Sequence, residues 1–191
     1  GQQTALALLA LYLGQARGVL PTEQVAALAD ALACLPYQVA AALQVDEAVE
    51  DIAHRFAQAR SFFYMGRGPN FPTALEGALK LKELSYIHAE GYPAGELKHG
   101  PIAMLDASLP CLVIATQGAT YAKTMSNIQE VRARGAQVIA LATAGDADAP
   151  RNGLDTLETS QLHADLVFLL VGLTIASVIV LRGTSAHRAA K

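Results

Sequence analysis

Short apolar runs separated by longer stretches that suit helices constrain the fold of this chain most. The runs lie at residues 61–65 (SFFYM), 111–115 (CLVIA) and 137–142 (QVIALA), and the helical stretches between them at 72–89 and 121–134. Strands that are apolar on both faces and alternate with helices belong to a parallel sheet that is covered on both sides. We therefore predict a doubly wound α/β domain, a three-layer, flavodoxin-like or Rossmann-like sheet with right-handed crossovers.

The first sixty residues have helical character instead. Residues 4–15 are nearly all Ala, Leu and Tyr, and Gly18 closes this first predicted helix. Residues 21–23 (Pro-Thr-Glu) carry the start signals of a second helix, and Pro36 breaks the pattern. Residues 46–60 then repeat apolar positions at helical spacing. The sheet domain is thus preceded by an all-helical segment.

We place the boundary between the two parts near residue 45. Residues 1–45 form the helical segment and residues 46–191 the sheet domain. Within the latter, residues 154–158 are a weakly patterned further strand, and a long apolar helix is predicted over residues 162–181. Its charge-free core, residues 166–181, spans only about 24 Å at 1.5 Å per residue, short of a bilayer core of about 30 Å. We interpret it as a buried helix and not as a membrane span.

The charge balance and the cysteines exclude several classes of protein. With 14 Lys and Arg against 17 Asp and Glu, the net charge is −3 and no basic block offers a surface for nucleic acid or an anionic membrane. Cys34 and Cys111 each lie in an apolar run, which favours buried, inert thiols in a reducing compartment over a disulfide. The five histidines show no ligand spacing, so we expect no metal site.

Two loops follow the first two predicted strands at the edge where parallel sheets bind ligands. Residues 66–70 are Gly-Arg-Gly-Pro-Asn and residues 116–120 are Thr-Gln-Gly-Ala-Thr. Glycines allow close approach of the backbone, and hydroxyls, amides and a guanidinium suit a sugar phosphate. The candidate binding residues are Gly66, Arg67, Gly68, Thr116, Gln117 and Thr120. The alternative is that both loops are ordinary strand-to-helix turns.

A stripe of charge on the intervening helix is the candidate catalytic feature. At 100° per residue, Lys80 lies about 40° from Glu76 and Glu83 about 20° to the other side, so the three side chains share one face. A Glu held by a Lys, with a His such as His99 nearby, is suited to moving protons on carbon and oxygen. The stripe is equally compatible with a solvated salt-bridge ladder, and His99 with a structural role beside the Gly-Pro turn.

Residues 66–106, GRGPNFPTALEGALKLKELSYIHAEGYPAGELKHGPIAMLD, resemble the second sugar-isomerase (SIS) domain of the glucosamine-6-phosphate synthase family, the isomerising glutamine:fructose-6-phosphate aminotransferases. Residues 111–143 fit that domain as well, and residues 1–60 resemble the end of the preceding SIS domain and its helical connection. The resemblance implies a cytoplasmic enzyme that needs no cofactor. It converts fructose 6-phosphate and ammonia from glutamine to glucosamine 6-phosphate.

The resemblance also implies roles for individual residues. Glu83 matches the base that moves a proton between C1 and C2, and Lys80 and Glu76 match the residues that tune it and contact the substrate. His99 matches the histidine that opens the sugar ring in the neighbouring subunit's site, which implies a homodimer. Lys191 follows Ala190 as the family's imine-forming Lys follows Ala, although the rest of the tail departs from the family pattern.

The N-terminal glutaminase and most of the first SIS domain of that family have no counterpart in this sequence. We therefore expect the isolated chain to be inactive with glutamine. Two alternatives remain open. The chain could be a stand-alone SIS module that binds a phosphosugar, or a ketose–aldose isomerase of phosphosugars that needs no nitrogen donor.

Overall fold

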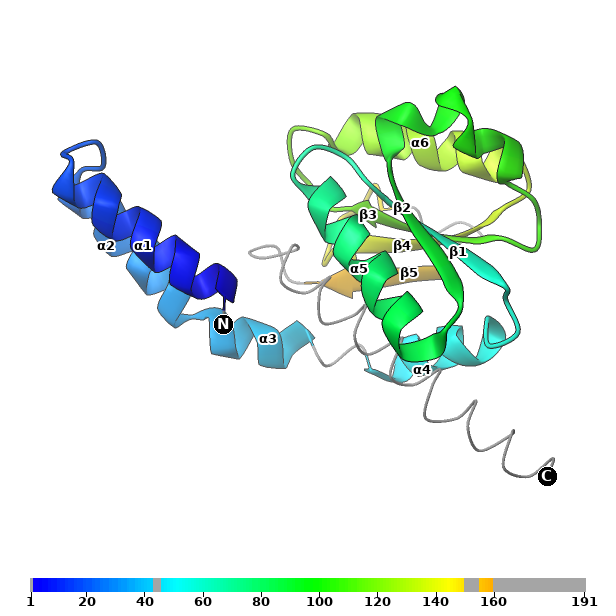
Figure 1. Cartoon of the computed structure of the whole chain (residues 1–191), viewed down its shortest axis with the longest axis horizontal. Helices are drawn as coiled ribbons and strands as arrows, with labels where there is room; N and C mark the ends of the chain where they lie inside the picture. Colours follow the sequence, from blue (N-terminus) through cyan, green and yellow to red (C-terminus); the bar gives the residue numbers. More distant parts are fainter. Residues whose placement is uncertain (1, 43–45, 150–154, 160–191) are drawn as a thin grey trace. The chain divides into compact units, whose positions relative to one another are not determined.

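The computed structural model describes residues 2–42, 46–149 and 155–159 (Figure 1). The chain divides into two compact units, Gly1–Ala40 and Ala41–Lys191. The predicted apolar helix over 162–181 and Lys191 lie outside the described residues.

The first unit consists of helices, as predicted. They are α1 (Gln2–Ala16), α2 (Thr22–Ala33) and the start of α3 (Leu35–Ala42). Gly18 follows the end of α1 with a φ of 66°, a conformation that favours glycine. The helical pattern breaks at Pro36 as predicted: α2 ends at Ala33, and Pro36 lies in the first turn of the next helix, α3, where a missing N–H costs nothing.

One prediction for this unit is wrong. Cys34, which follows α2, is exposed and not buried. The physical reason is that a thin pair of helices has no interior: no residue of α2 is buried. Large apolar side chains of α1 are exposed too, among them Leu6 (66%) and Tyr12 (67%).

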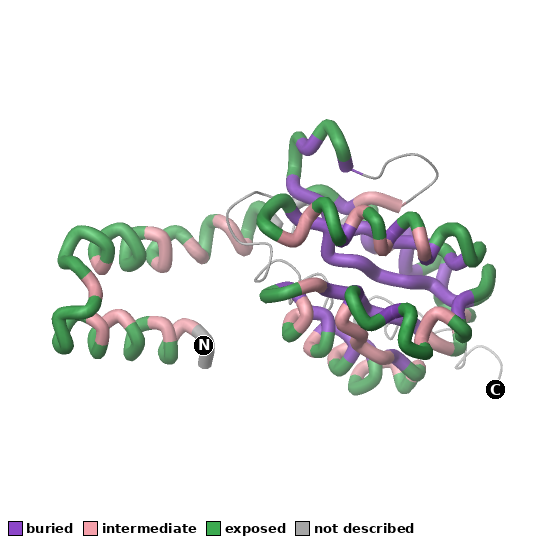
Figure 2. Tube along the Cα trace, turned by 90° about the horizontal axis from the view of Figure 1, so that it is seen from above, coloured by how far each residue is buried: buried purple, intermediate pink, exposed green. Residues whose placement is uncertain are grey.

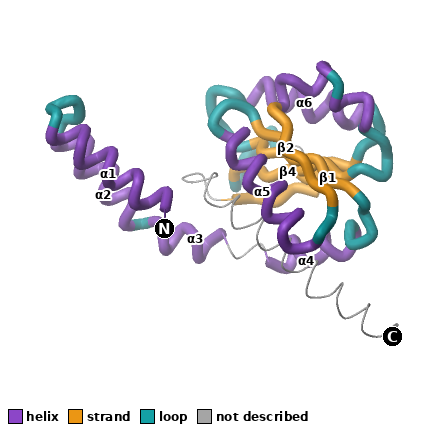
Figure 3. Tube along the Cα trace, in the orientation of Figure 1, coloured by secondary structure: helices purple, strands orange, loops and turns teal. Residues whose placement is uncertain are grey.

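The second unit is built on a five-stranded sheet in which every neighbouring pair is parallel, as predicted. The strands are β1 (Ser61–Gly66), β2 (His88–Pro93), β3 (Pro110–Ala115), β4 (Gln137–Thr143) and β5 (Asp155–Thr159). Their order across the sheet is β2-β1-β3-β4-β5. The three strong apolar runs form the adjacent strands β1, β3 and β4, and the weakly patterned one forms the edge strand β5. The strands of the sheet are drawn in orange in Figure 3.

Helices cover both faces of this sheet, which confirms the three-layer fold. Helices α4 (Asp46–Arg55) and α5 (Asn70–Ser85) cover one face, and α6 (Tyr121–Ala133) covers the other (Figure 1). Alternate residues of β1 serve the two cores: Phe62 and Tyr64 pack toward α4 and α5, and Phe63 and Met65 toward α6. Burial of such side chains stabilises the fold by about 1.5–3 kcal/mol each. The strands are accordingly the buried layer in Figure 2.

The prediction of a helix over residues 72–89 is wrong at its end. Helix α5 stops at Ser85, Tyr86 turns the chain with a φ of 59°, and β2 follows as the edge strand. The strand was missed because its sequence, HAEGYP, is polar and has no apolar run. Gly91 fits it to α5, since a Cβ there would lie 2.9 Å from the Leu75 Cα.

The chain turns between α4 and β1. The predicted helix over residues 46–60 therefore ends at Arg55, and Ala59 donates its N–H to the Phe56 carbonyl in that turn.

Cys111 is buried in β3, as predicted, and burial raises the pKa of its thiol to about 12. Among the described residues, no helix is both long and apolar enough to cross a membrane.

Candidate active site

The two candidate loops lie side by side at the carboxyl edge of the sheet. This follows from the pairing of β1 with β3, because the ends of parallel neighbours meet at one edge. Asn70, in the first loop, donates its Nδ2 hydrogen to Thr116 Oγ1 in the second, at 3.2 Å. A Cβ on Gly68 would lie 3.2 Å from Thr120 Cγ2. The sequence therefore located two loops that the fold joins into one surface.

The backbone geometry of the first loop requires glycine at both Gly66 and Gly68. A Cβ on Gly66 would lie 2.1 Å from the carbonyl oxygen of Asn70, in the first turn of α5. Gly68 has a φ of 57°, in the left-handed region. The tight strand-to-helix turn thus accounts for both glycines, and their contact with a ligand stays a prediction.

Several polar groups of the second loop already form hydrogen bonds within the protein. Thr116 is buried, with its Oγ1 accepting from Asn70. The Gln117 N–H donates to Thr143 Oγ1 at 3.0 Å, and the Thr120 carbonyl accepts from the Thr124 N–H. The loop is therefore held by hydrogen bonds to residues outside it, and Gln117 is exposed at its surface.

Arg67 extends away from its loop. Its Nη1 donates to Asn127 Oδ1 on α6 at 3.2 Å, and the guanidinium lies against the backbone of Gly95. Asn127 and its neighbour Glu130 were not predicted from the sequence. The Asn-x-x-Glu spacing, which places both side chains on one face of a helix, was the signal available.

The charged stripe on α5 forms as predicted. Lys80 Nζ lies 2.6 Å from Glu83 Oε2 and 3.5 Å from Glu76 Oε1. The hydrogen bond from Lys80 to Glu83, more than any other contact, raises the pKa of the Lys80 amine. The Lys80 ammonium thus donates a hydrogen bond to the Glu83 carboxylate, whose side chain is 50% exposed.

His99 belongs to a different part of the unit. It ends a 3₁₀ helix, η2 (Ala94–His99), which leads into η3 (Pro101–Met104). Its Nδ1 lies 2.7 Å from Glu96 Oε2, and its side chain is 74% exposed. Within the described parts of this chain, no hydrogen bond or ion pair links His99 to Glu83. The structure thus forms the stripe and joins the two loops, whereas His99 is hydrogen-bonded to Glu96 of its own 3₁₀ helix.

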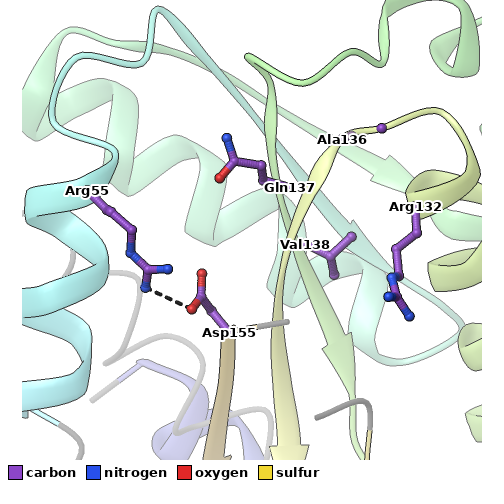
Figure 4. Close-up of a pocket in the computed structure, with 7 residues that line it drawn as sticks. Arg55, Arg132, Ala136, Gln137, Val138 and Asp155 are labelled. Atoms are coloured by element: carbon purple, nitrogen blue, oxygen red, sulfur yellow. Dashed lines mark hydrogen bonds and ion pairs between the residues drawn. The ribbon is translucent and has the colours of Figure 1, made fainter. Parts of the chain in front are cut away.

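A hollow of about 500 Å³ lies elsewhere, at the amino edge of the sheet (Figure 4). Its rim includes Gln137 and Asp155, which begin β4 and β5, and an ion pair of 2.7 Å joins Arg55 Nη2 to Asp155 Oδ1. Since all strands are parallel, this edge is opposite the candidate loops. The hollow is separate from the predicted site. Over residues 2–42, 46–149 and 155–159, no three His, Cys, Asp or Glu side chains are grouped so as to hold a metal ion.

Comparisons with known proteins agree with this fold. A family model described as the SIS domain matches residues 55–181. Glutamine–fructose-6-phosphate aminotransferase (isomerizing) from Thermus thermophilus is 52% identical over 159 residues, 83% of this chain and 26% of that protein. The enzyme of the same name from Chlorobaculum tepidum is 46% identical over 191 residues, 98% of this chain and 31% of that protein.

A solved structure is similar over nearly the whole chain. It is the C-terminal domain of glucosamine-fructose-6-phosphate aminotransferase from Francisella tularensis, with a TM-score of 0.88 and 34% identity. The match covers 93% of this chain and 51% of that one. The chain thus spans between about a quarter and a third of the length of the curated relatives.

Proposed function

Because this chain belongs to the SIS-domain family, we propose that it is the C-terminal isomerase region of a glutamine–fructose-6-phosphate aminotransferase. Its partners would then be a first SIS domain and a glutaminase that supplies ammonia. The exposed Leu6, Leu9 and Tyr12 of α1 support this proposal, since apolar side chains gathered on one helix generally pack against further protein. The activity is that of the longer protein and not of this chain alone.

The contact of Lys80 with Glu83 carries the proposal. In the reaction, ammonia replaces the C2 oxygen of open-chain fructose 6-phosphate and water leaves. Glu83 then takes a proton from C1 and a proton is returned to C2, while the C1 hydroxyl proton moves to nitrogen. The C2 imine becomes an amine and C1 becomes an aldehyde, which is glucosamine 6-phosphate. A base that acts on carbon must be held in a fixed orientation, and the 2.6 Å contact with Lys80 provides it.

His99 supplies the second proton-transfer group of the proposal. An imidazole can pass a proton to the ring oxygen near neutral pH and so open the sugar ring. Glu96, at 2.7 Å from Nδ1, orients the imidazole and leaves Nε2 for this transfer. Because His99 and Glu83 lie on different elements with no hydrogen bond or ion pair described between them, we propose that His99 acts in the site of a second copy, within a homodimer. The loop residues Thr116, Gln117 and Thr120 are candidate sugar-phosphate contacts, and Lys191 is the candidate imine former.

The experiment uses a chimera in which this chain replaces the matching region of the Thermus thermophilus relative. Glucosamine 6-phosphate is assayed with fructose 6-phosphate and glutamine, for the parent, Glu83→Gln and Lys80→Met. We expect Glu83→Gln to lower kcat by about 10²–10⁴-fold, the contribution of general acid–base catalysis. Glu23→Gln and Lys82→Met are matched controls, since both side chains are exposed. Glu23 lies in α2, and Lys82 lies on a different face of α5 from the stripe.

Equal activity of Glu83→Gln and the parent would overturn the proposal. Deuterium entering C1 or C2 of a hexose phosphate without any nitrogen donor would identify a ketose–aldose isomerase instead. Binding of a hexose phosphate by the isolated chain that is lost in the double variant Thr116→Ala/Thr120→Ala, but unaffected by Glu83→Gln, would identify a binding module.

A further inference from the structure

A continuous set of polar contacts joins the loop after β1, the helix α6 and the 3₁₀ helix η2. Arg67 Nη1 donates to Asn127 Oδ1 at 3.2 Å, and Asn127 Nδ2 donates to Glu130 Oε2 at 3.3 Å. Lys98 Nζ completes the set at 2.9 Å from Glu130 Oε1. We call these four residues, Arg67, Asn127, Glu130 and Lys98, the polar brace.

The chemistry of the polar brace permits only one orientation of its central amide. Arg67 offers only donors, so it must meet the Asn127 oxygen, and the carboxylate of Glu130 accepts, so it must meet the NH₂ group. Asn127 and Glu130 are three residues apart on α6 and therefore share a face. The hydrogen bond from Lys98 keeps the pKa of Glu130 below its usual range, and the carboxylate is charged at neutral pH.

The polar brace holds η2 at two points. Lys98 is tied to Glu130, and the Arg67 guanidinium lies so close to Gly95 that a Cβ there would be 3.0 Å from Nη1. Between these points, Leu97 is fully buried in the same core cluster as Ile128 of α6. The buried leucine anchors the 3₁₀ helix, and the polar contacts on either side fix its rotation about that anchor.

His99 is the residue directly after Lys98. Its only described side-chain partner, Glu96, belongs to η2 as well, so its position depends on how η2 is held. We propose that Arg67, Asn127 and Glu130 are positioning residues for His99, and that Arg67 acts through this brace instead of contacting the sugar phosphate. The part of this inference that concerns catalysis rests on the proposed function; the part that concerns the placement of η2 does not.

The first test uses the 191-residue chain itself and measures amide hydrogen exchange of residues 94–99. We expect Glu130→Gln to speed that exchange by about tenfold while β3 and β4 keep their protection. Lys98→Met removes the other end of the ion pair at a side chain that is 65% exposed, so the fold does not depend on it, and we expect the same local effect. Glu23→Gln is the control. Unchanged exchange of residues 94–99 in both brace variants would overturn the inference.

The second test is kinetic and uses the chimera described above. We expect Glu130→Gln to lower kcat by about tenfold with little change in the KM for fructose 6-phosphate, because it displaces a catalytic group without touching substrate. In a His99→Asn background the same substitution should have almost no further effect, since both act through one group. Glu130→Asp should restore part of the activity.

Arg67→Lys separates the two roles of the arginine. A lysine retains the charge but loses the planar fork that meets both Asn127 and Gly95. A positioning residue predicts a lower kcat, whereas a phosphate ligand predicts a higher KM at unchanged kcat. The second pattern, or additive effects of Glu130→Gln and His99→Asn, would overturn the inference. An inactive parent chimera would instead count against the proposed function, and the exchange result would still decide the placement of η2.

Discussion

Replacing Gly66 with alanine tests how the candidate active site is built. A Cβ at this position would lie 2.1 Å from the Asn70 carbonyl oxygen, 2.4 Å from its carbon and 2.8 Å from the Phe71 nitrogen. All three are backbone atoms in the first turn of α5, so no side chain can rotate away. The start of the helix must move by about 1 Å to restore a contact of 3.0 Å.

The size of the effect follows from overpacking. Forcing an extra carbon into a filled site costs about 1–3 kcal/mol, and this site belongs at the upper end because the obstructing atoms are backbone. In a unit of this size each kcal/mol of lost unfolding free energy lowers Tm by about 2–4 °C. A loss of about 3 kcal/mol in Gly66→Ala should therefore lower Tm by about 6–12 °C. The shift also moves Asn70 from Thr116 and loosens the joined loops.

Gly135→Ala is the matched control. Gly135 has a φ of 84°, and a Cβ added there would meet nothing within 4 Å, so its cost is backbone strain alone, about 1 kcal/mol. Gly66 does not have a positive φ, so its cost is the clash alone. Thermal unfolding of both variants, followed by circular dichroism, gives the comparison. A smaller loss of Tm in Gly66→Ala than in Gly135→Ala would refute this account of the turn.

Two further predictions concern titratable side chains. In the native chain, a thiol reagent at pH 8 should modify the exposed Cys34 and leave Cys111 unmodified until the chain unfolds, because burial holds the pKa of the Cys111 thiol near 12. Rapid reaction of both thiols would contradict the burial of Cys111. Burial, with the hydrogen bond to Glu90, raises the pKa of Tyr92 to about 12. The protonated Tyr92 hydroxyl therefore contributes fully to the free energy of unfolding below pH 10, the ordinary pKa of tyrosine. This contribution is lost as the pH rises toward 12. Glu90→Gln should lower the pKa of Tyr92 in an absorbance titration, and an unchanged titration would contradict the assigned contact.

The central sheet could be predicted because its strands are defined locally. Residues 61–65, 111–115 and 137–142 are short runs that are apolar almost without interruption, which is typical of strands with both faces covered. The edge strand β2 was missed for the opposite reason. Only Ala89 of its six residues is buried, so HAEGYP needs no apolar run, and Gly91 fits the strand against α5.

The candidate site, too, could be predicted from the sequence only in part. The stripe of Glu76, Lys80 and Glu83 could be predicted because helix geometry alone places residues four and three apart side by side. Arg67 was assigned to the ligand from its place in a glycine loop, and its contact with Asn127 could not be foreseen. The two residues are 60 positions apart, and only the packing of α6 on the sheet brings them together.

The sequence by itself thus determined the layered α/β fold, the two loops at the carboxyl edge of the sheet and the charged stripe on α5. Each depends on interactions within one element or on the direction of parallel strands. Tertiary structure alone decided the direction of the Arg67 side chain, the exposure of Cys34 and the contacts that hold the His99 segment. Those depend on which surfaces meet across the chain, and such contacts leave no periodic mark in the residues that make them.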